Sequence, residues 1–255
     1  MKAWRHGLAD LATLTGRMLK HNVRSVDTIM TVLGMPLMIL LAFVFVLGGA
    51  MNTGPVRYVD FVVPVVLVFC VANGASYTAF RVNRDVTAGM YARFRTMPIA
   101  RWALTGGHVA ASVVANGASV IVLMGDAWLI GYRPHATWAG WAVTAALGLA
   151  TLAAFSAVGV TCGLVAKTDE GAIMFFYPLM GLLFVSSGFA PTSTMPVALR
   201  SFADHQPMTP LIDAIRGAQL GQVESHATWV ALAWLVGFIV VFSSVATVAG
   251  RRRWA

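Results

Sequence analysis

Long runs of apolar residues constrain this chain more than any other feature of its sequence. Six of them approach or exceed the length of about 20 residues that a helix needs to cross a bilayer. The predicted spans are residues 28–50, 58–80, 102–131, 137–166, 172–189 and 228–249. A soluble helical domain would carry narrower apolar stripes, so the sequence predicts an all-α polytopic membrane protein with six transmembrane helices.

Composition indicates one membrane domain over residues 1–255. Of the 255 residues, 58% are hydrophobic and 11% are charged, whereas soluble domains carry about 25% charged residues. Mean hydropathy is +0.74. The net charge of +8 is typical of basic loops that lie beside anionic headgroups, so we expect no nucleic-acid partner.

The distribution of basic residues predicts the orientation of the chain. All but four of the 18 lysines and arginines fall in the N-terminal segment, the second and fourth loops and the C-terminal tail. The exceptions are Arg57, Arg133, Arg200 and Arg216. This bias and the even number of predicted spans agree, and together they predict that both termini are cytoplasmic.

Two segments on the predicted cytoplasmic side are amphipathic. Residues 1–27 carry apolar side chains at helical spacing, which indicates an N-terminal interfacial helix on the membrane surface or, alternatively, a soluble helix. The loop 81–101 repeats apolar residues every four positions until Pro98, which would end the helix. We expect this second helix either to dock into a partner's groove as a coupling helix or to lie on the membrane.

The outer segment 190–227 is less apolar than the spans that flank it. Thr209 followed by Pro210 is a favourable helix start, because a capping residue then precedes a first-turn proline. Leu211, Ile212 and Ile215 would give that helix an apolar face. We expect one or two short re-entrant helices here, dipping into the outer leaflet between spans five and six.

The sequence lacks the residue patterns that nucleotide hydrolysis, serine-nucleophile catalysis and metal binding need. A phosphate-binding P-loop needs Gly-Lys-Ser/Thr, and no lysine in the chain follows a glycine. Ser186 and Ser187 could be nucleophiles, but span six has no histidine to activate them. Cys70 and Cys162 lack metal-ligand spacing. We therefore expect no catalytic residue, no metal site and no cofactor in this chain, which would not be an enzyme.

A few polar residues lie inside the predicted spans. Asp126, near the outer end of span three, is either a functional carboxylate or one that faces water at the helix end. Asn73 and Asn116 either hydrogen-bond between helices or line a cavity. Gly159 and Gly163 form a GxxxG pair that indicates close helix packing.

Two segments resemble the permease subunits of ABC-2 exporters, especially the daunorubicin-resistance type. The second loop contains the pattern D-x3-G-x3-R-x-R-T-x-P-I, which begins at Asp85. The segment before the last span contains S-S-G-F-x-P, which begins at Ser186, and P-x-T-P-L-x-D-A-x-R-G, which begins at Pro207. Gln206 stands where the family often has asparagine. The resemblance covers nearly the whole chain in the same order.

The resemblance implies how such a subunit works with its partners. Two permeases, identical or similar, would pair, and each would dock a cytoplasmic ABC ATPase that binds ATP and Mg. The residues expected to make that coupling contact are Arg84, Asp85, Gly89, Met90, Arg93, Arg95 and Pro98. The outer gate would involve Phe189, Pro191, Pro207, Thr209 and Arg216. From their place inside the spans, Asn73, Asn116 and Asp126 are candidates for parts of the substrate pathway.

The sequence therefore predicts a permease in a bacterial plasma (inner) membrane that moves an amphipathic drug, antibiotic or lipid-like substrate out of the cell. Two alternatives stay open. An ABC-2 exporter of a polysaccharide or lipid-linked glycan would share the fold, and a proton-coupled secondary transporter would depend on Asp126.

Overall fold

A computed structural model of the chain describes residues 11–19, 30–50, 56–90 and 101–254. All regular secondary structure within these residues is helical. Five stretches are long and apolar enough to cross a membrane: Met30–Leu47, Tyr58–Thr87, Thr105–Leu129, Trp138–Val165 and Ser225–Gly250. The fold is that of a polytopic helical membrane protein.

Helix α4 (Tyr58–Thr87) is the centre of the bundle. Of its most apolar 18-residue window, 94% is buried inside the protein. Helices α6 (Arg101–Leu129) and α7 (Trp138–Val165) pack along it, and α12 (Ser225–Trp254) packs on the far side of α7. The outer helices expose many large apolar side chains, as expected where helices face lipid or another subunit.

The first span is a helix with altered winding. A π-helical turn η1 (Met30–Gly34), α3 (Met35–Leu41) and a second π-helical stretch η2 (Ala42–Leu47) follow one another. Pro36 lacks an amide hydrogen and so cannot bond to the preceding turn. The Asn73 side chain of α4 donates instead to the carbonyl oxygens of Thr31 (2.9 Å) and Val32 (3.4 Å). Asn73 is therefore a packing residue that stabilises the proline-containing turn.

The predicted fifth span, 172–189, is wrong as a single long helix. Helix α8 (Asp169–Ile173) begins after Thr168, whose hydroxyl accepts from the Gly171 amide at 3.0 Å. A turn then separates it from α9 (Phe176–Phe184). Pro178 lies in the first turn of α9. It has no amide hydrogen, so it cannot donate a helix hydrogen bond to the residues between α8 and α9. Both short helices contact α4.

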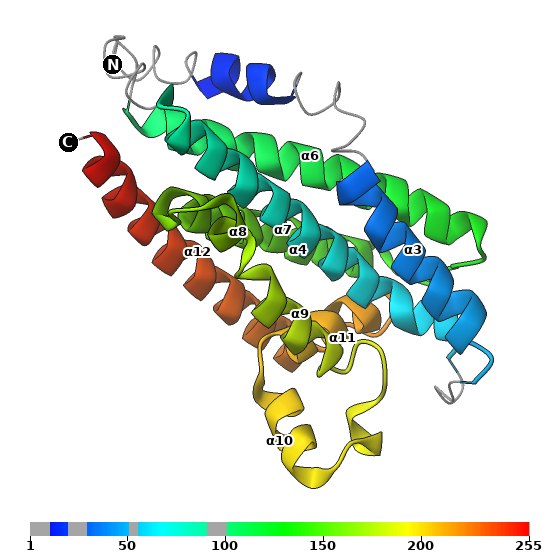
Figure 1. Ribbon diagram of the computed structural model, residues 1–255. Coiled ribbons are helices and arrows are strands. Elements are labelled where there is room, and N and C mark those ends of the chain that lie inside the picture. The colour runs from blue at the N-terminus through cyan, green and yellow to red at the C-terminus, as the bar shows by residue number, and fades with distance from the viewer. Residues whose placement is uncertain (1–10, 20–29, 51–55, 91–100, 255) are drawn as a thin grey trace.

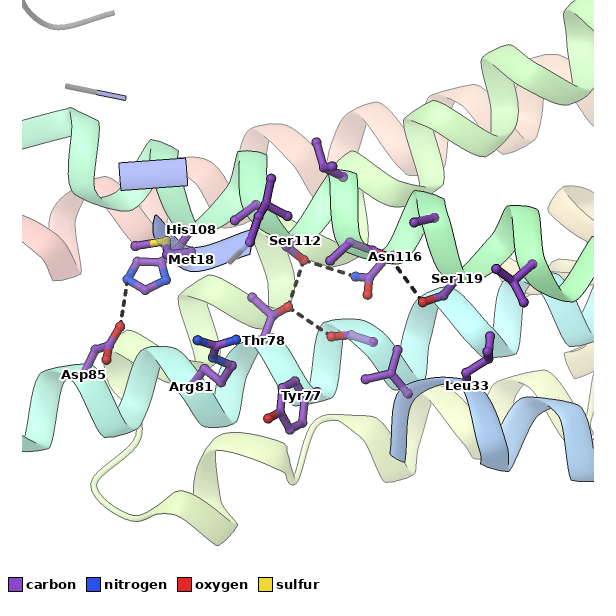
Figure 2. A pocket seen from close by; sticks show the side chains of 18 residues that line it. Met18, Leu33, Tyr77, Thr78, Arg81, Asp85, His108, Ser112, Asn116 and Ser119 are labelled. Carbon is purple, nitrogen blue, oxygen red and sulfur yellow. Dashed lines mark hydrogen bonds and ion pairs between the residues drawn. The ribbon is translucent and has the colours of Figure 1, made fainter. Parts of the chain in front are cut away.

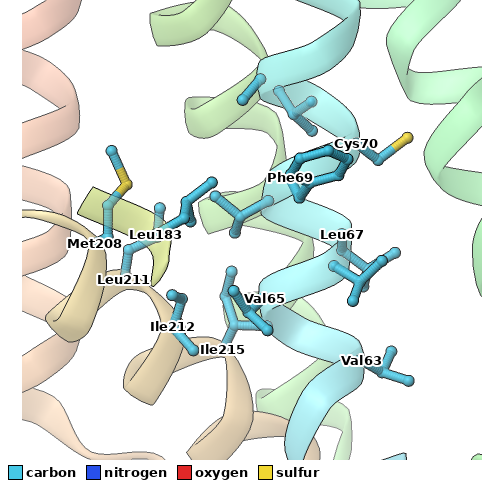
Figure 3. Packing of buried hydrophobic residues seen from close by; sticks show 14 of the residues in the cluster. Val63, Val65, Leu67, Phe69, Cys70, Leu183, Met208, Leu211, Ile212 and Ile215 are labelled. Carbon is cyan, nitrogen blue, oxygen red and sulfur yellow. The ribbon is translucent and has the colours of Figure 1, made fainter. Parts of the chain in front are cut away.

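Three further short helices lie between α9 and α12. They are η3 (Thr192–Thr194), α10 (Val197–His205) and α11 (Met208–Gln219). Figure 1 shows α10 and α11 at one end of the bundle, with the helical residues 11–19 and the last turns of α12 at the opposite end. Apolar residues of α11 and α9 pack against α4, as Figure 3 shows for Ile212, Ile215 and Leu183.

The GxxxG pair packs α7 against α4 within the same chain. A Cβ added to Gly159 would overlap the carbonyl oxygen of Ala75, and one added to Gly163 would lie 2.5 Å from the carbonyl oxygen of Ala79. Asn83, which is fully buried, then donates to the carbonyl oxygens of Gly163 (3.1 Å) and Ala166 (2.8 Å). Glycine is required here because the two backbones are in contact.

Candidate functional site

The predicted site residues fall at the two ends of α4 and in its middle. Arg84, Asp85, Gly89 and Met90 lie at the end that holds residues 11–19. Arg93, Arg95 and Pro98 lie outside the described residues. Phe189, Pro191, Pro207, Thr209 and Arg216 lie at the opposite end, which we call the outer end.

The coupling segment begins as a direct continuation of α4. The prediction of a separate helix starting at residue 81 is wrong for its first turns, because α4 runs without a break to Thr87. Gly89 follows with a φ of +71°, a conformation that L side chains rarely adopt. The Ala88 and Gly89 amides donate to Arg84 and Val86 carbonyls and close the helix end.

The side chains near this helix end contact α6 and the N-terminal helical segment. His108 of α6 is buried, and its Nε2 lies 3.5 Å from Oδ2 of Asp85. Arg84 is exposed, with its guanidinium carbon 5.5 Å from the centre of the Phe80 ring. Met90 packs against a small apolar cluster that contains Leu14 of the N-terminal helical segment. Arg84, Asp85 and Met90 therefore lie around the place where that segment packs against α4.

The outer end is organised around Arg216 of α11. Its Nε donates to the Phe61 carbonyl at 3.1 Å, and its Nη2 donates to the Ser187 and Gly188 carbonyls at 2.9 and 3.2 Å. Its Nη1 lies 2.9 Å from Oδ1 of Asp213. The guanidinium carbon also lies 3.8 Å from the centre of the Phe61 ring. One side chain thus joins α11, the segment after α9 and the start of α4.

A second set of bonds joins the same two motifs. The Ser187 hydroxyl donates to Asp213 at 2.6 Å, and its amide donates to the Thr209 hydroxyl at 3.4 Å. Gln206 donates to Thr209 (3.2 Å) and to the Leu182 carbonyl (3.2 Å). The S-S-G-F and P-x-T-P-L-x-D-A-x-R-G motifs therefore form one hydrogen-bonded unit, which we call the outer lock (186–189 with 206–216).

The predicted cap of α11 is wrong by two residues. The helix begins at Met208, whose amide donates to Oε1 of Gln206 at 2.9 Å, so Gln206 supplies the capping acceptor. Pro207 precedes the first helical residue. Thr209 lies inside the first turn, and its hydroxyl is used to hold Ser187. Gln206 therefore has a defined structural role at the start of α11.

Burial disfavours the charged forms of Asp213 and Arg216 in the outer lock. It raises the pKa of the Asp213 carboxyl, while the Ser187 hydroxyl and Arg216 act to lower it. It also lowers the pKa of Arg216 to about 10, and Asp213 opposes that change. Because each group offsets the desolvation of the other, removing one would leave a mostly buried charge without its partner.

The remaining outer residues support the same region. Phe189 is buried between Phe43 and Phe184, whose ring centres lie 4.4 and 4.9 Å from its own. Its carbonyl accepts from the Tyr58 hydroxyl at 3.4 Å. The Pro191 carbonyl accepts from the amide and the hydroxyl of Thr194 and so holds the η3 turn. The contacts of Phe189 attach the outer segment to η2 and α4.

Asn116 belongs to a polar cluster in the middle of the bundle. The Ser112 hydroxyl lies 2.9 Å from the Thr78 hydroxyl and 2.8 Å from the Ser156 hydroxyl, so it bridges α4, α6 and α7. Asn116 Nδ2 donates to the same hydroxyl at 3.1 Å. Gly74 gives room for the Asn116 amide, which a Cβ would overlap. This cluster connects the helices and also lines a cavity, which Figure 2 shows.

Asp126 is not part of either group. It lies on α6 near the end of the helix and is partly exposed. Its carboxylate makes no hydrogen bond or ion pair to another residue in the part of the chain that the structure describes. Its position is that of a carboxylate near an aqueous boundary, without the acidic or basic partner that a proton relay needs.

Sequence reasoning missed two residues that organise the site. Asp213 was visible in the motif, and its spacing of three from Arg216 on one helix would have predicted their ion pair. Asn83 had no such signal, because its partners are backbone carbonyls of α7. Within the described ranges, no group of three or more His, Cys, Asp or Glu side chains is placed to hold a metal ion.

The fold defines a helical membrane protein in which one buried helix, α4, joins the outer lock to the end that holds residues 11–19. Comparison with known families then gives a specific assignment. Residues 9–220 match the family described as ABC-2 type transporter. Since this match covers most of the chain, the protein belongs to the ABC-2 transporter family.

Two curated relatives align with this chain over most of their length. The chain is 27% identical over 213 residues to the daunorubicin resistance ABC transporter permease protein DrrB1 of Streptomyces coeruleorubidus, covering 82% of this chain and 74% of the relative. It is 23% identical over 257 residues to the probable doxorubicin resistance ABC transporter permease protein DrrC of Mycobacterium tuberculosis, covering 96% and 89%. Both relatives are named as permeases of drug-resistance transporters.

Proposed function

We propose that this protein is the membrane subunit of an ATP-binding-cassette exporter that removes amphipathic drugs from the cell. The observation that carries the proposal is the family match over residues 9–220, together with two relatives named as permeases of daunorubicin or doxorubicin resistance. The two sequence motifs of the outer lock lie in hydrogen-bonding contact, which supports their having one shared role.

We propose six membrane crossings with both termini in the cytoplasm of a bacterial cell. Helix α7 ends near residues 11–19, whereas α12 begins beside α11 at the other end. The intervening chain has to travel between the two ends, and the α8–α9 pair is the segment available for that crossing. The excess of basic residues at the end with residues 11–19 supports its cytoplasmic location.

Energy for transport would come from a separate ABC ATPase that binds ATP and Mg. The chain itself has no Gly-Lys-Ser/Thr sequence. We propose that the ATPase docks at the end of α4, where Arg84 and Asp85 are followed by the turn at Gly89. Met90, Arg93, Arg95 and Pro98 would complete the contact. A second permease, identical or similar, would complete the transporter.

The proposed substrate is an amphipathic molecule of the kind named for the relatives. Export of a polysaccharide or lipid-linked glycan is the alternative within the same family. A proton-coupled secondary transporter is less well supported, because Asp126 has no hydrogen-bond or ion-pair partner among the described residues. We expect Asp126→Asn to leave ATP-driven export within about twofold of the wild type, whereas loss of all transport would favour proton coupling.

Affinity purification in mild detergent tests the ATPase partner directly. We expect a P-loop ATPase to co-purify at one copy per permease and to be lost in Gly89→Pro, because proline cannot adopt a φ of +71°. The matched control is Gly131→Pro, which changes a residue with a φ of +102° at the outer end. Retention of the ATPase by Gly89→Pro, or equal loss in both variants, would overturn the docking site.

A further inference from the structure

A half-open cavity of about 400 Å³ lies beside α4. It is bounded by residues 18–19, by η1, by α4 and by α6, and Figure 2 shows its lining. Most of the wall is apolar, and one side carries the hydroxyls and amide of the Ser112 cluster. A volume of this size lies in the range of small-ligand sites, which is about 300–1,000 Å³.

The cavity continues into a second, basic one at the same end of the bundle. The second cavity measures about 430 Å³ and shares Met18, Tyr77, Arg81 and Asp85 with the first. It adds Arg17 and Arg84, so the charged side chains that line it, among the residues that the structure describes, are three arginines and one aspartate. An apolar channel that leads to a basic mouth matches the two halves of an anionic amphiphile.

Arg81 at the junction has unused hydrogen-bonding capacity. It is partly buried, yet its guanidinium makes no hydrogen bond or ion pair to any other residue, as far as the described part of the chain goes. Asp85 is one turn away, but its carboxylate faces His108, as the dashed line in Figure 2 marks. A guanidinium has five N–H donors that fit a phosphate group, and burying them without an acceptor is costly.

The apolar cavity opens sideways, toward the expected position of the lipid. Val114 and Val122 of α6 line it and are 52% and 47% exposed, and Ala118 between them is also exposed. A hydrocarbon chain could therefore enter from the bilayer without passing through water. Basic pockets between membrane helices on the cytoplasmic side are known to take anionic lipid headgroups.

We propose that this groove binds one anionic phospholipid of the cytoplasmic leaflet. The phosphate would lie against Arg81, with Arg17 and Arg84 adding positive charge, and one acyl chain would lie in the cavity beside the Ser112 cluster. The charge balance of the mouth favours an anionic headgroup over a cationic drug, because three arginines face one aspartate among the described residues that line it. The site is thus distinct in chemistry from one for cationic substrates.

Native mass spectrometry of the purified chain in mild detergent tests the proposal. The probes are dioleoyl phosphatidylglycerol and dioleoyl phosphatidylcholine, which share their chains and differ in headgroup charge. We expect one phosphatidylglycerol bound per chain, with about tenfold weaker binding of phosphatidylcholine. We expect Arg81→Gln to weaken phosphatidylglycerol about tenfold, whereas Arg200→Gln on the exposed face of α10 leaves it unchanged.

A second variant tests the position of the acyl chain. Ala115 lines the apolar cavity and is partly exposed, so Ala115→Phe fills the cavity without entering the basic mouth. We expect this variant to lose retention of phosphatidylglycerol while keeping the wild-type elution volume. Equal binding of the two lipids, or full binding by either Arg81→Gln or Ala115→Phe, would overturn the proposal. The measurement needs neither ATPase nor drug, so its failure would leave the exporter assignment intact.

Discussion

The two ends of α4 differ in how completely their polar groups are paired. At the outer end Asp60 is paired with Arg57 at 2.8 Å, and Arg216 bonds to four partners on three segments. At the other end Arg81 has no hydrogen bond or ion pair among the described residues, and Arg84 lies over a phenylalanine ring. The same helix thus joins a region of paired charges to one where Arg81 has no such partner among the described residues.

This difference indicates a division of roles along one helix. A buried polar network with its partners in place makes a region rigid and specifies a single arrangement. A partly buried arginine without a partner is instead available to a ligand or to another protein. We infer that the outer lock sets the position of α4, and that the opposite end is where lipid and ATPase would act on it.

Removal of the central arginine of the outer lock should have the largest effect. Arg216→Ala would remove bonds to three backbone carbonyls and leave Asp213 without its ion-pair partner. We expect a loss of about 3 kcal/mol in the free energy of unfolding, at the low end for a buried pair because Asp213 is partly exposed. Denaturant unfolding in mild detergent measures it.

The paired variant for this prediction is Arg81→Ala, at the other end of α4. It removes an arginine that has no hydrogen bond or ion pair within the described residues, so we expect a change within about 0.5 kcal/mol in lipid-free detergent. Equal losses in the two variants would contradict the distinction between a fixed end and an incompletely paired end.

The contact between α7 and α4 should be intermediate in its effect. In Gly163→Ala the added methyl would lie 2.5 Å from the Ala79 carbonyl oxygen and 2.7 Å from Val82. We expect a loss of about 2 kcal/mol, the usual cost of overpacking a close contact. The control is Gly148→Ala on the same helix, where nothing lies within 4 Å of the new methyl. Thermal unfolding of both variants measures the two losses of stability. A loss in Gly163→Ala but not in Gly148→Ala would show that the close contact with α4 is responsible.

Loss of the central hydroxyl in the mid-bundle cluster should have the smallest effect. Ser112→Ala removes the bridge between Thr78 and Ser156. Hydrogen bonds between membrane helices contribute about 0.6 kcal/mol on average, so we expect a loss of about 1 kcal/mol for the two. A double-mutant cycle with Thr78→Val isolates the first bond. A coupling near zero would mean that the cluster lines the cavity without stabilising the bundle.

The helical membrane fold could be predicted from the sequence because it depends on local patterns. Run length gives five of the predicted spans. The GxxxG pair correctly indicates close packing, although the sequence could not say that α4 is its partner. Pro36 is visible in the sequence as a residue that cannot donate a helix hydrogen bond. The compensating Asn73 could not be assigned, because its acceptors lie on another helix.

The predictions that were wrong concern features that depend on tertiary contacts. The break between α8 and α9 was hidden, since residues 172–189 are as apolar as a continuous span. Thr209 looked like the cap of α11, but its hydroxyl accepts from the Ser187 amide, and the Gln206 side chain accepts from the first helical amide instead. The two motifs could be recognised in the sequence. Their contact through Asp213 and Arg216 could not be predicted, because it depends on how the chain folds.

Transport in inside-out membrane vesicles tests the exporter assignment most directly. The vesicles would contain the permease with its co-purified ATPase, and the probe would be daunorubicin. We predict uptake that requires ATP, persists when the proton gradient is collapsed and is lost in Gly89→Pro but not in Gly131→Pro. Uptake by the permease alone, without ATP and in proportion to a proton gradient, would contradict the account.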